Sequence, residues 1–305
     1  MNLTKAFFRL VRWPNLVFIA ITQLLFYLCI YEPLYNKQDF RKLSLLIIAS
    51  IFISAAGYII NDYFDLNIDQ INKPRKNVID KAIHRRWAII WHLLLSLSGI
   101  VLTALAVGLS QWYLVLANLG CVILLWFYST SFKRQLLIGN IVISLLTSWT
   151  VLLLFFAFAT PDNAFQTNDP VSIKFFRLAF LYAGFAFIIS LIREAIKDME
   201  DMEGDARYGC KTLPIVVGIR STKLYVVIWI VVLSATLIIL QMYILQFGWW
   251  HATVYGVLFV IVPLLYLLNN VRKASDSGDF HAGSNLCKLL MFTGILSMTF
   301  FHFYF

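Results

Sequence analysis

Two short acidic stretches hold the residues best suited to chemistry. NDYFDLNID follows one long apolar run, and KDMEDMEGD follows another later in the chain. The aspartates are spaced three and then four residues apart in both stretches: Asp62, Asp65 and Asp69 in the first, and Asp198, Asp201 and Asp205 in the second. Because such spacings place side chains on one helix face, we expect two carboxylate clusters if the helices continue beyond the apolar runs. Asn61 joins the first face.

Carboxylates held this close need a counter-charge. Two like charges 4 Å apart repel by about 4 kcal/mol at an effective dielectric constant of 20. No histidine or cysteine cluster accompanies the aspartates, and oxygen-only ligands favour a hard ion such as Mg²⁺ over zinc or copper. Protein-bound Mg²⁺ usually shares its remaining positions with water and substrate phosphates. One carboxylate at a helix end is usually just solvated, but two matching sets favour a shared magnesium site for a phosphorylated substrate.

Basic residues accompany both stretches. They are Lys73, Arg75 and Lys76 after the first set of aspartates, Arg193 and Lys197 before the second set, and Lys133 and Arg134 at the end of a separate apolar run. A single Lys or Arg beside a membrane span usually marks topology. Several of them beside carboxylates favour a combined metal and anion site, because arginine binds phosphate oxygens bidentately.

The elements that position these residues are predicted to be membrane-spanning helices. The chain is 60% hydrophobic and 13% charged, with a mean hydropathy of +0.78, which favours a polytopic membrane protein with a single domain, residues 1–305. Apolar segments long enough to cross a bilayer recur nine times, at about 15–31, 43–60, 86–107, 112–128, 136–159, 176–193, 222–245, 250–268 and 285–304. Their length favours an all-α fold over barrel strands.

The distribution of charge predicts the orientation. With a cytoplasmic N-terminus and nine spans, all but five of the 25 Lys and Arg residues lie on the cytoplasmic side; the five outside are Lys37, Arg41, Lys42, Lys174 and Arg177. This asymmetry follows the positive-inside rule, so the net charge of +9 indicates orientation rather than nucleic-acid binding. We expect a multi-pass protein of the plasma or inner membrane, with the N-terminus and both acidic stretches cytoplasmic and a retained first span.

Two further patterns bear on the architecture. Equivalent aspartates in the two sets differ by 136 positions, and four spans separate them, which hints at two related four-helix halves followed by a ninth helix. The four cysteines, Cys29, Cys121, Cys210 and Cys287, form no CxxC pair. They argue against both a zinc site and a disulfide framework.

The motifs resemble those of a known family. The pattern NDxxDxxxD, the downstream KDxEDxEGD and the trailing GCKTLPIVVG resemble the UbiA superfamily of intramembrane prenyltransferases, and the resemblance covers nearly the whole chain. Within it, LIREAIKDMEDMEGD followed by KTLP is similar to the digeranylgeranylglyceryl phosphate synthase branch. This resemblance implies about nine helices around a central cavity with an aspartate-rich cytoplasmic cap. It also implies Mg²⁺-dependent transfer of a geranylgeranyl group from its diphosphate to geranylgeranylglyceryl phosphate, forming an ether.

The resemblance also assigns roles to residues. The family's metal-binding motifs correspond to Asn61, Asp62, Asp65 and Asp69, and to Asp198, Asp201 and Asp205. The expected catalytic residues are Asp65, Asp69, Asp201, Asp205 and Lys133, and the expected substrate-binding residues are Arg12, Asn15, Asn61, Arg75, Tyr128, Lys133, Arg193 and Lys197. The family's diphosphate-contacting YxxxK reads YSTSFK here, so Tyr128 and Lys133 lie five residues apart instead of four. Arg12 and Asn15 in RWPN resemble a polar pair near the acceptor.

Side chains inside the spans are less informative. Trp126, Phe127 and Trp149 are candidates for lining a channel for the isoprenoid tail, although most aromatic residues in such a chain serve packing. His92 is more typical of a buried, hydrogen-bonded side chain than of a base. Asn140 lies in an apolar run, where an amide needs a partner from a neighbouring helix or a substrate.

Other functions remain open at this point. Within the family, the acceptor is aromatic in some branches, such as hydroxybenzoate, homogentisate or naphthoate. A CDP-alcohol phosphotransferase would need a DGxxAR run before its DxxxD, and the chain has none. A cation transporter would carry its carboxylates near mid-membrane, whereas these lie at span ends. The expected partners are a polyprenyl diphosphate, a lipid or aromatic acceptor and membrane lipid; we infer no nucleic acid and no obligate protein partner.

Overall fold

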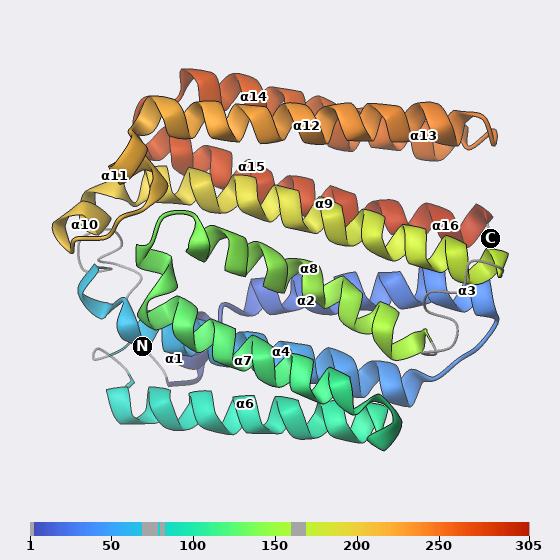
Figure 1. The fold of residues 1–305 in the computed structure, drawn as a ribbon, viewed down its shortest axis with the longest axis horizontal. Helices are drawn as coiled ribbons and strands as arrows, with labels where there is room; N and C mark the ends of the chain where they lie inside the picture. The colour runs from blue at the N-terminus through green and yellow to red at the C-terminus, as the bar shows by residue number, and fades with distance from the viewer. Residues whose placement is uncertain (1–2, 69–78, 80–82, 160–168, 305) are drawn as a thin grey trace.

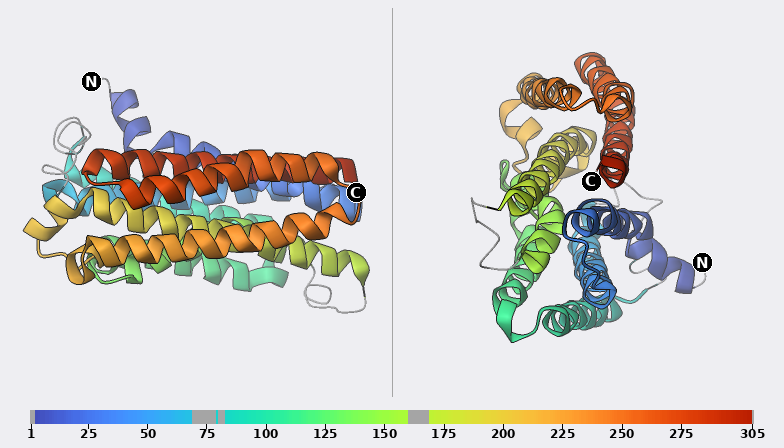
Figure 2. Two further views of the ribbon diagram at one scale, coloured as in Figure 1. Left: turned by 90° about the horizontal axis from the view of Figure 1, so that it is seen from above. Right: turned by 90° about the vertical axis from the view of Figure 1, so that its right-hand side faces the viewer.

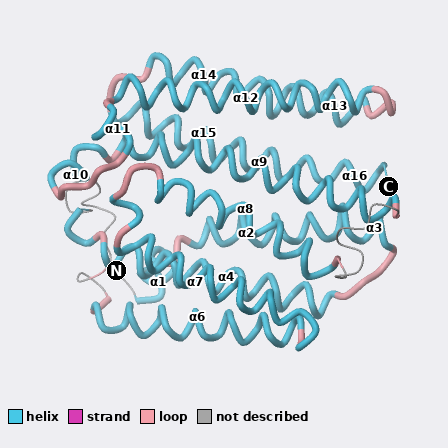
Figure 3. The backbone as a smooth tube through the Cα atoms, viewed as in Figure 1, coloured by secondary structure: helices cyan, strands magenta, loops and turns pink. Residues whose placement is uncertain are grey.

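The computed structural model describes residues 3–68, 79, 83–159 and 169–304, and these are almost entirely helical. Apart from one isolated bridge between Ile79 and Ile83, the described residues pair in no strand (Figure 3). They include 9 helical spans that are long and apolar enough to cross a membrane. The prediction of an all-α, multi-pass membrane protein with nine spans is therefore confirmed.

Several spans are built from consecutive helical segments. The spans are α2 (Trp13–Phe26) with η1 (Tyr27–Tyr31) and α3 (Glu32–Tyr35), α4 (Phe40–Phe64), α6 (Arg85–Val107), η2 (Leu109–Gln111) with α7 (Trp112–Thr130), α8 (Ile138–Phe158), α9 (Pro170–Glu200), α12 (Ile219–Leu245), α13 (Trp250–Gly256) with η4 (Val257–Ile261) and α14 (Val262–Lys273), and α15 (Ser277–Leu296) with η5 (Ser297–Phe300) and α16 (Phe301–Tyr304). The shorter helices outside the spans are α1 (Leu3–Leu10), η3 (Phe132–Arg134), α10 (Met202–Arg207) and α11 (Leu213–Val217).

The spans lie side by side, and the short helices α1, α10 and α11 gather at one end of the bundle (Figure 1). We call this the motif end, because α4 and α9 finish there with the two acidic stretches. Figure 2 shows the same bundle from above and end-on. At 31 residues, α9 is much longer than the predicted span 176–193, because its helix begins at Pro170 and continues to Glu200, in the second motif.

Small residues bring α4 close to its neighbours. A Cβ at Gly99 of α6 would lie 2.6 Å from Cγ1 of Ile53, and a Cβ at Gly57 would lie 2.9 Å from the Leu125 side chain of α7. A side chain at either position would therefore force the neighbouring side chain to shift. Helices in lipid associate largely through such close packing, because lipid tails are as apolar as leucine and no hydrophobic effect drives the helices together.

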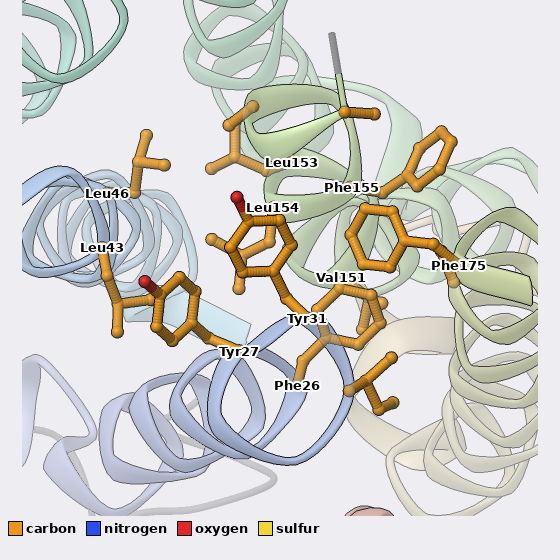
Figure 4. Close-up of a cluster of buried hydrophobic side chains, with 14 of the residues drawn as sticks. Phe26, Tyr27, Tyr31, Leu43, Leu46, Val151, Leu153, Leu154, Phe155 and Phe175 are labelled. Atoms are coloured by element: carbon orange, nitrogen blue, oxygen red, sulfur yellow. The ribbon is translucent and has the colours of Figure 1, made fainter. Parts of the chain in front are cut away.

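A cluster of buried aromatic and aliphatic side chains, shown in Figure 4, packs around the start of α4 and the end of α8, opposite the motif end. The ring centroids of Phe26 and Phe175 are 5.6 Å apart, and those of Phe155 and Phe175 are 5.2 Å apart. Tyr27 and Tyr31 of η1 pack beside them with their rings 5.1 Å apart. The cluster joins α2, α8 and α9 at this end of the bundle.

Candidate active site

Both acidic motifs line one cavity of about 570 Å³. Its walls come from α2, α4, α7, α8, α9 and α15, and α10 and η3 border it at the motif end. The predicted residues that line it are Arg12, Asn15, Asn61, Asp62, Asp65, Tyr128, Lys133, Arg193, Lys197, Asp198, Asp201 and Asp205. Four predicted residues, Asp69, Lys73, Arg75 and Lys76, lie outside the described part of the chain. The structure thus places two motifs from distant parts of the sequence around one space.

The two motif helices end in the same way. Asp65 follows the last residue of α4 with φ −90° and ψ 0°, and its N–H donates to the Asn61 carbonyl at 3.0 Å. Asp201 follows the last residue of α9 with φ −93° and ψ 5°, and its N–H donates to the Lys197 carbonyl at 2.9 Å. The two positions therefore have matching backbone conformations, in the region typical of a turn.

The expectation that each triplet lies along one continuous helix was wrong for both motifs, because α4 ends at Phe64 and α9 ends at Glu200, and the chain turns at Asp65 and at Asp201. Asp205 consequently belongs to the separate helix α10. Its N–H still donates to the Asp201 carbonyl, at 3.2 Å, so the turn is tight enough for Asp205 to border the same cavity as Asp198.

Lys133 organises the first motif. Its Nζ lies 2.5 Å from Oδ1 of Asp65 and 3.4 Å from Oδ1 of Asn61. The Asn61 amide in turn donates to Oδ2 of Asp65 at 2.9 Å. The side chains of Lys133 and Asp65 are only 10% and 16% exposed, so the pair is largely shielded from solvent. Asp62 has a different partner, Arg12, whose guanidinium lies 2.6 Å from its Oδ1.

The unusual spacing of Tyr128 and Lys133 follows from the way α7 ends. The helix finishes at Thr130, and the chain continues through the 3-10 turn η3, which carries Lys133. Both Tyr128 and Lys133 line the cavity despite the extra residue between them. Gly139, in the first turn of α8, fixes the position of η3, because a Cβ there would lie 2.9 Å from Cα of Lys133 and from the Phe132 carbonyl oxygen.

The second motif is held by α8 and by its own helix. The Asn140 amide donates to Oδ2 of Asp198 at 2.9 Å, which gives this intramembrane amide a partner. One turn earlier on α9, Arg193 pairs with Glu194 at 2.6 Å. Glu194 also lines the cavity. It was not among the predicted site residues, which in this motif were the three aspartates and the basic residues Arg193 and Lys197.

A backbone connection joins the second motif to the loop that carries Lys133. The Lys211 N–H donates to the Arg134 carbonyl at 2.8 Å, and the Cys210 N–H donates to the Asp205 carbonyl at 3.0 Å. Burial, together with the nearby Asp205 carboxylate, raises the pKa of the Cys210 thiol. Cys210 is therefore a neutral side chain that lines the cavity wall.

The three aromatic residues that were candidates for lining the isoprenoid channel lie in different places. Trp149 lines the cavity, and its indole N–H donates to Oδ1 of Asn118 at 2.9 Å. Trp126 and Phe127 are exposed on the outer side of α7, so the expectation that they line the channel was wrong for these two. Trp126 packs instead against His92, with ring centroids 5.4 Å apart. His92 is buried, with Nδ1 3.0 Å from the Ala56 carbonyl oxygen, as expected for a structural side chain.

The donor set suits a hard cation. The motif side chains on the cavity offer carboxylate and amide oxygens, which are the ligands that Mg²⁺ prefers. Within the described residues, no three His, Cys, Asp or Glu side chains converge on one point. Asp62, Asp65 and Asp198 instead contact Arg12, Lys133 and Asn140. Because Mg²⁺ binds through only one or two carboxylates plus substrate phosphates and water, the residues present fit a metal that arrives with its substrate.

Comparisons with known proteins agree on the proteins that this chain resembles. Residues 14–297 match the UbiA prenyltransferase family. The chain is 30% identical to the digeranylgeranylglyceryl phosphate synthase of Sulfurisphaera tokodaii, over 94% of this chain and 96% of that protein. It is 35% identical to the corresponding synthase of Pyrococcus horikoshii, over 70% of this chain and 69% of that protein. These matches favour prenyl transfer over the phosphotransferase and transporter alternatives.

Solved structures share the fold. One concerns digeranylgeranylglyceryl phosphate synthase in membranes; it has a TM-score of 0.62 and 23% identity and covers 98% of this chain and 99% of its own. The apo structure of a UbiA homologue from Aeropyrum pernix has a TM-score of 0.64, 14% identity and coverage of 97% and 98%. A UbiA homologue from Archaeoglobus fulgidus, bound to GPP and Mg²⁺, has a TM-score of 0.58, 15% identity and coverage of 96% and 99%.

Proposed function

The chain belongs to the UbiA prenyltransferase family, and from this premise we propose that it transfers a geranylgeranyl group from geranylgeranyl diphosphate to geranylgeranylglyceryl phosphate. The bond between the allylic carbon and the diphosphate oxygen breaks, and an ether forms with the acceptor hydroxyl, which loses its proton. One observation carries the proposal: the ends of α4 and α9 bring both aspartate motifs to one cavity that also holds Lys133. The relatives named as digeranylgeranylglyceryl phosphate synthases support the choice of acceptor.

The aspartates of both motifs are the proposed ligands of Mg²⁺, with Asn61 beside them. A bound magnesium ion would draw negative charge from the diphosphate as it leaves. The Archaeoglobus fulgidus homologue, which was solved with GPP and Mg²⁺, supports this assignment. Asp69 belongs to the proposed ligand set by sequence, as Arg75 belongs to the proposed diphosphate contacts.

Lys133 and the basic residues of α9 are the proposed diphosphate contacts. Lys133 is already held in a shielded position by Asp65, so little reorganisation is needed when substrate phosphates replace or join that carboxylate. Arg193 and Lys197 line the cavity beside the second motif. Fixed positive charges aimed at the departing diphosphate stabilise the transition state more than the ground state, because the charge on the leaving oxygen grows as the bond breaks.

The deeper part of the cavity suits the isoprenoid chain. Apolar side chains such as Ile53, Leu125, Leu153 and Phe185 line it away from the aspartates. The aromatic cluster fills the bundle beyond it. These walls keep water from the allylic cation until the acceptor hydroxyl attacks. Trp149 offers a ring face to the cation, and its hydrogen bond to Asn118 fixes the ring.

The proposed orientation places the N-terminus and the motif end in the cytoplasm of the plasma or inner membrane. The excess of Lys and Arg in the segments at this end supports that orientation. Single cysteines introduced at Ser275, at the motif end, and at Asn36, at the opposite end, would test it in intact cells. A membrane-impermeant maleimide is expected to label only the Asn36→Cys protein; labelling of only Ser275→Cys would reverse the orientation.

The reaction itself can be tested with purified protein in detergent. Geranylgeranyl diphosphate and Mg²⁺ are supplied with geranylgeranylglyceryl phosphate, hydroxybenzoate or homogentisate in separate reactions, and diphosphate release and lipid products are measured. We expect release and an ether product only with the glycerol phosphate lipid. An alkylated aromatic product, with no ether formed, would show that the chain has an aromatic acceptor.

A further inference from the structure

The last span, α15, presents a polar face to the cavity. His281, Ser284, Asn285 and Lys288 all line the cavity wall, and their offsets of three, four and seven residues from His281 place them on one helix face. Further along the same face the lining side chains become apolar, with Met291 and Ile295. The polar half of this face lies toward the motif end, so it faces the region where the charged groups of the substrates are expected.

Lys288 lies deep within the span. It follows Ser277, the first residue of α15, by eleven residues, which corresponds to about 16 Å along the axis at 1.5 Å per residue. Its side chain is half-buried on the cavity wall. A charged side chain at such a depth is costly in lipid and usually serves a ligand or a transport path. This depth distinguishes Lys288 from the basic residues at the ends of the spans. Membrane topology alone explains those residues.

A contact between α2 and α15 places Lys288 at about the depth of Asn15. The rings of Phe18 and Phe292 meet with centroids 5.6 Å apart, and α2 and α15 both run away from the motif end (Figure 1). Asn15 precedes Phe18 by three residues, and Lys288 precedes Phe292 by four. Asn15 and Lys288 therefore lie at the same depth, about one helical turn nearer the motif end than the aromatic contact.

The start of α15 is attached to the second aspartate motif. His281 Nδ1 lies 2.8 Å from Oε1 of Glu200, the last residue of α9, and the Ser277 hydroxyl donates to the Glu200 carbonyl at 3.1 Å. These contacts fix the register of the polar face relative to Asp201. In the end-on view of Figure 2, the blue α2 and the red α15 lie on one side of the molecule, away from the green α7 and α8, which are connected through η3 and its Lys133.

We propose that Lys288, with Asn15 and Asn285, binds the phosphate group of the acceptor, a glycerol phosphomonoester that carries one isoprenoid chain. This site rests on the proposed function and deepens it, because it separates an acceptor subsite between α2 and α15 from the diphosphate site between α4 and α9. The lysine ammonium offers charged N–H donors to a phosphate dianion, and the Asn285 amide offers further donors. The Asn15 amide donates one N–H to the Tyr58 hydroxyl at 3.3 Å and carries a second N–H. The apolar residues beyond Lys288 on α15 then accommodate the acceptor's chain.

The same arrangement explains a choice between acceptor classes. An aromatic acceptor has no phosphate, so it would not gain the charge-assisted hydrogen bonds that Lys288 offers to a phosphate group. A site built to hydrogen-bond a polar group of its substrate discriminates strongly against analogues that lack the group. Lys288 would thus favour phosphorylated acceptors over alcohols of the same shape.

Two measurements on the full-length protein test this inference. The first is the steady-state KM for geranylgeranylglyceryl phosphate and for geranylgeranylglycerol, which lacks the phosphate, in wild type, Lys288→Met and Lys288→Arg. A charge-assisted hydrogen bond contributes about 1.5–3 kcal/mol, so Lys288→Met is expected to raise the KM for the phosphorylated acceptor about 10- to 100-fold. Its preference for the phosphorylated over the unphosphorylated acceptor should disappear, and Lys288→Arg should restore most of it.

The second measurement needs no catalysis. Thermal unfolding in EDTA, with and without geranylgeranylglyceryl phosphate, reports binding of the acceptor alone. Wild type and the control Lys273→Met, whose lysine is exposed at the end of α14, should be stabilised equally, whereas Lys288→Met should be stabilised much less. Equal stabilisation and equal acceptor preference in Lys288→Met and wild type would overturn the subsite while leaving the proposed function intact. A wild type that neither binds nor uses the glycerol phosphate lipid would overturn both.

Discussion

Lys133 Nζ lies 2.5 Å from Oδ1 of Asp65, and so connects the turn after α7 directly to the first aspartate motif. The two residues are 68 positions apart in sequence, yet both are largely shielded from solvent. An ion pair at the mouth of a cavity that also holds the second motif keeps a cation in place before any anionic substrate arrives. Pre-positioned charge of this kind is the usual basis of leaving-group stabilisation, because no reorganisation is needed during the reaction.

Replacing Lys133 by Met should therefore lower kcat by about 10²- to 10³-fold, the range observed when one pre-positioned donor to a developing negative charge is removed. Lys133→Arg keeps the charge and should retain part of the activity. Lys211→Met is a matched control, because Lys211 is exposed and follows the second motif without lining the cavity. The measurement is the initial rate of diphosphate release. A wild-type kcat in the Lys133→Met protein would show that Lys133 does not take part in the reaction.

Asp65 and Asp201 should be equally sensitive to substitution, because they have the same backbone conformation at the ends of α4 and α9. Asp65→Asn and Asp201→Asn preserve shape but remove the charge that a magnesium ion needs, and we expect each to lower activity at least about 100-fold. Glu203→Gln serves as the acidic control: Glu203 belongs to the second motif but pairs with Arg207 on the exposed side of α10. Comparable activity in Asp201→Asn and Glu203→Gln would contradict the metal assignment.

Chelation should abolish the reaction in the wild-type protein. Incubation with excess EDTA is expected to stop diphosphate release, and added Mg²⁺ should restore it. Ca²⁺ should restore it poorly, because Ca²⁺ takes six to eight ligands at longer distances than a compact octahedral site provides. The measurement is the rate as a function of free metal concentration. Undiminished turnover in EDTA would mean that Lys133, Arg193 and their neighbours neutralise the diphosphate without a metal.

Some features of this structure could be predicted from the sequence and others could not, because each feature leaves a different physical signal in the sequence. Span number and position follow from hydropathy, because a bilayer imposes a fixed length of apolar helix. The meeting of the two motifs was expected from their matching spacing. The turns at Asp65 and Asp201 were not, because polar residues after a span can continue a helix or leave it. In the second motif, the carbonyls of Asp205 and Arg134 accept hydrogen bonds from the N–H groups of Cys210 and Lys211, which follow α10.

The face that each span turns inward was the hardest feature to predict. In α7, Trp126 is exposed on the outside, whereas Tyr128 lines the cavity. Lipid and a hydrophobic cavity are equally apolar, so periodicity does not distinguish them in an all-apolar helix. Lys288 carries the signal that sequence analysis overlooked: a charge near the middle of a span, in phase with His281 and Ser284, indicates an inward polar face.

Gly139 gives the most direct test of how η3 positions Lys133. A Cβ at this position would lie 2.9 Å from Cα of Lys133 and from the Phe132 carbonyl oxygen, and both are backbone atoms that cannot rotate away. Gly139→Ala should therefore displace η3, move Lys133 away from Asp65 and lower kcat by about tenfold or more, in the direction of Lys133→Met. Gly120→Ala is the matched control, because a Cβ at Gly120 has no atom within 4 Å and alanine favours the α7 helix. If Gly139→Ala matched Gly120→Ala in kcat and in thermal stability, the position of Lys133 would not depend on the close packing of η3 against α8.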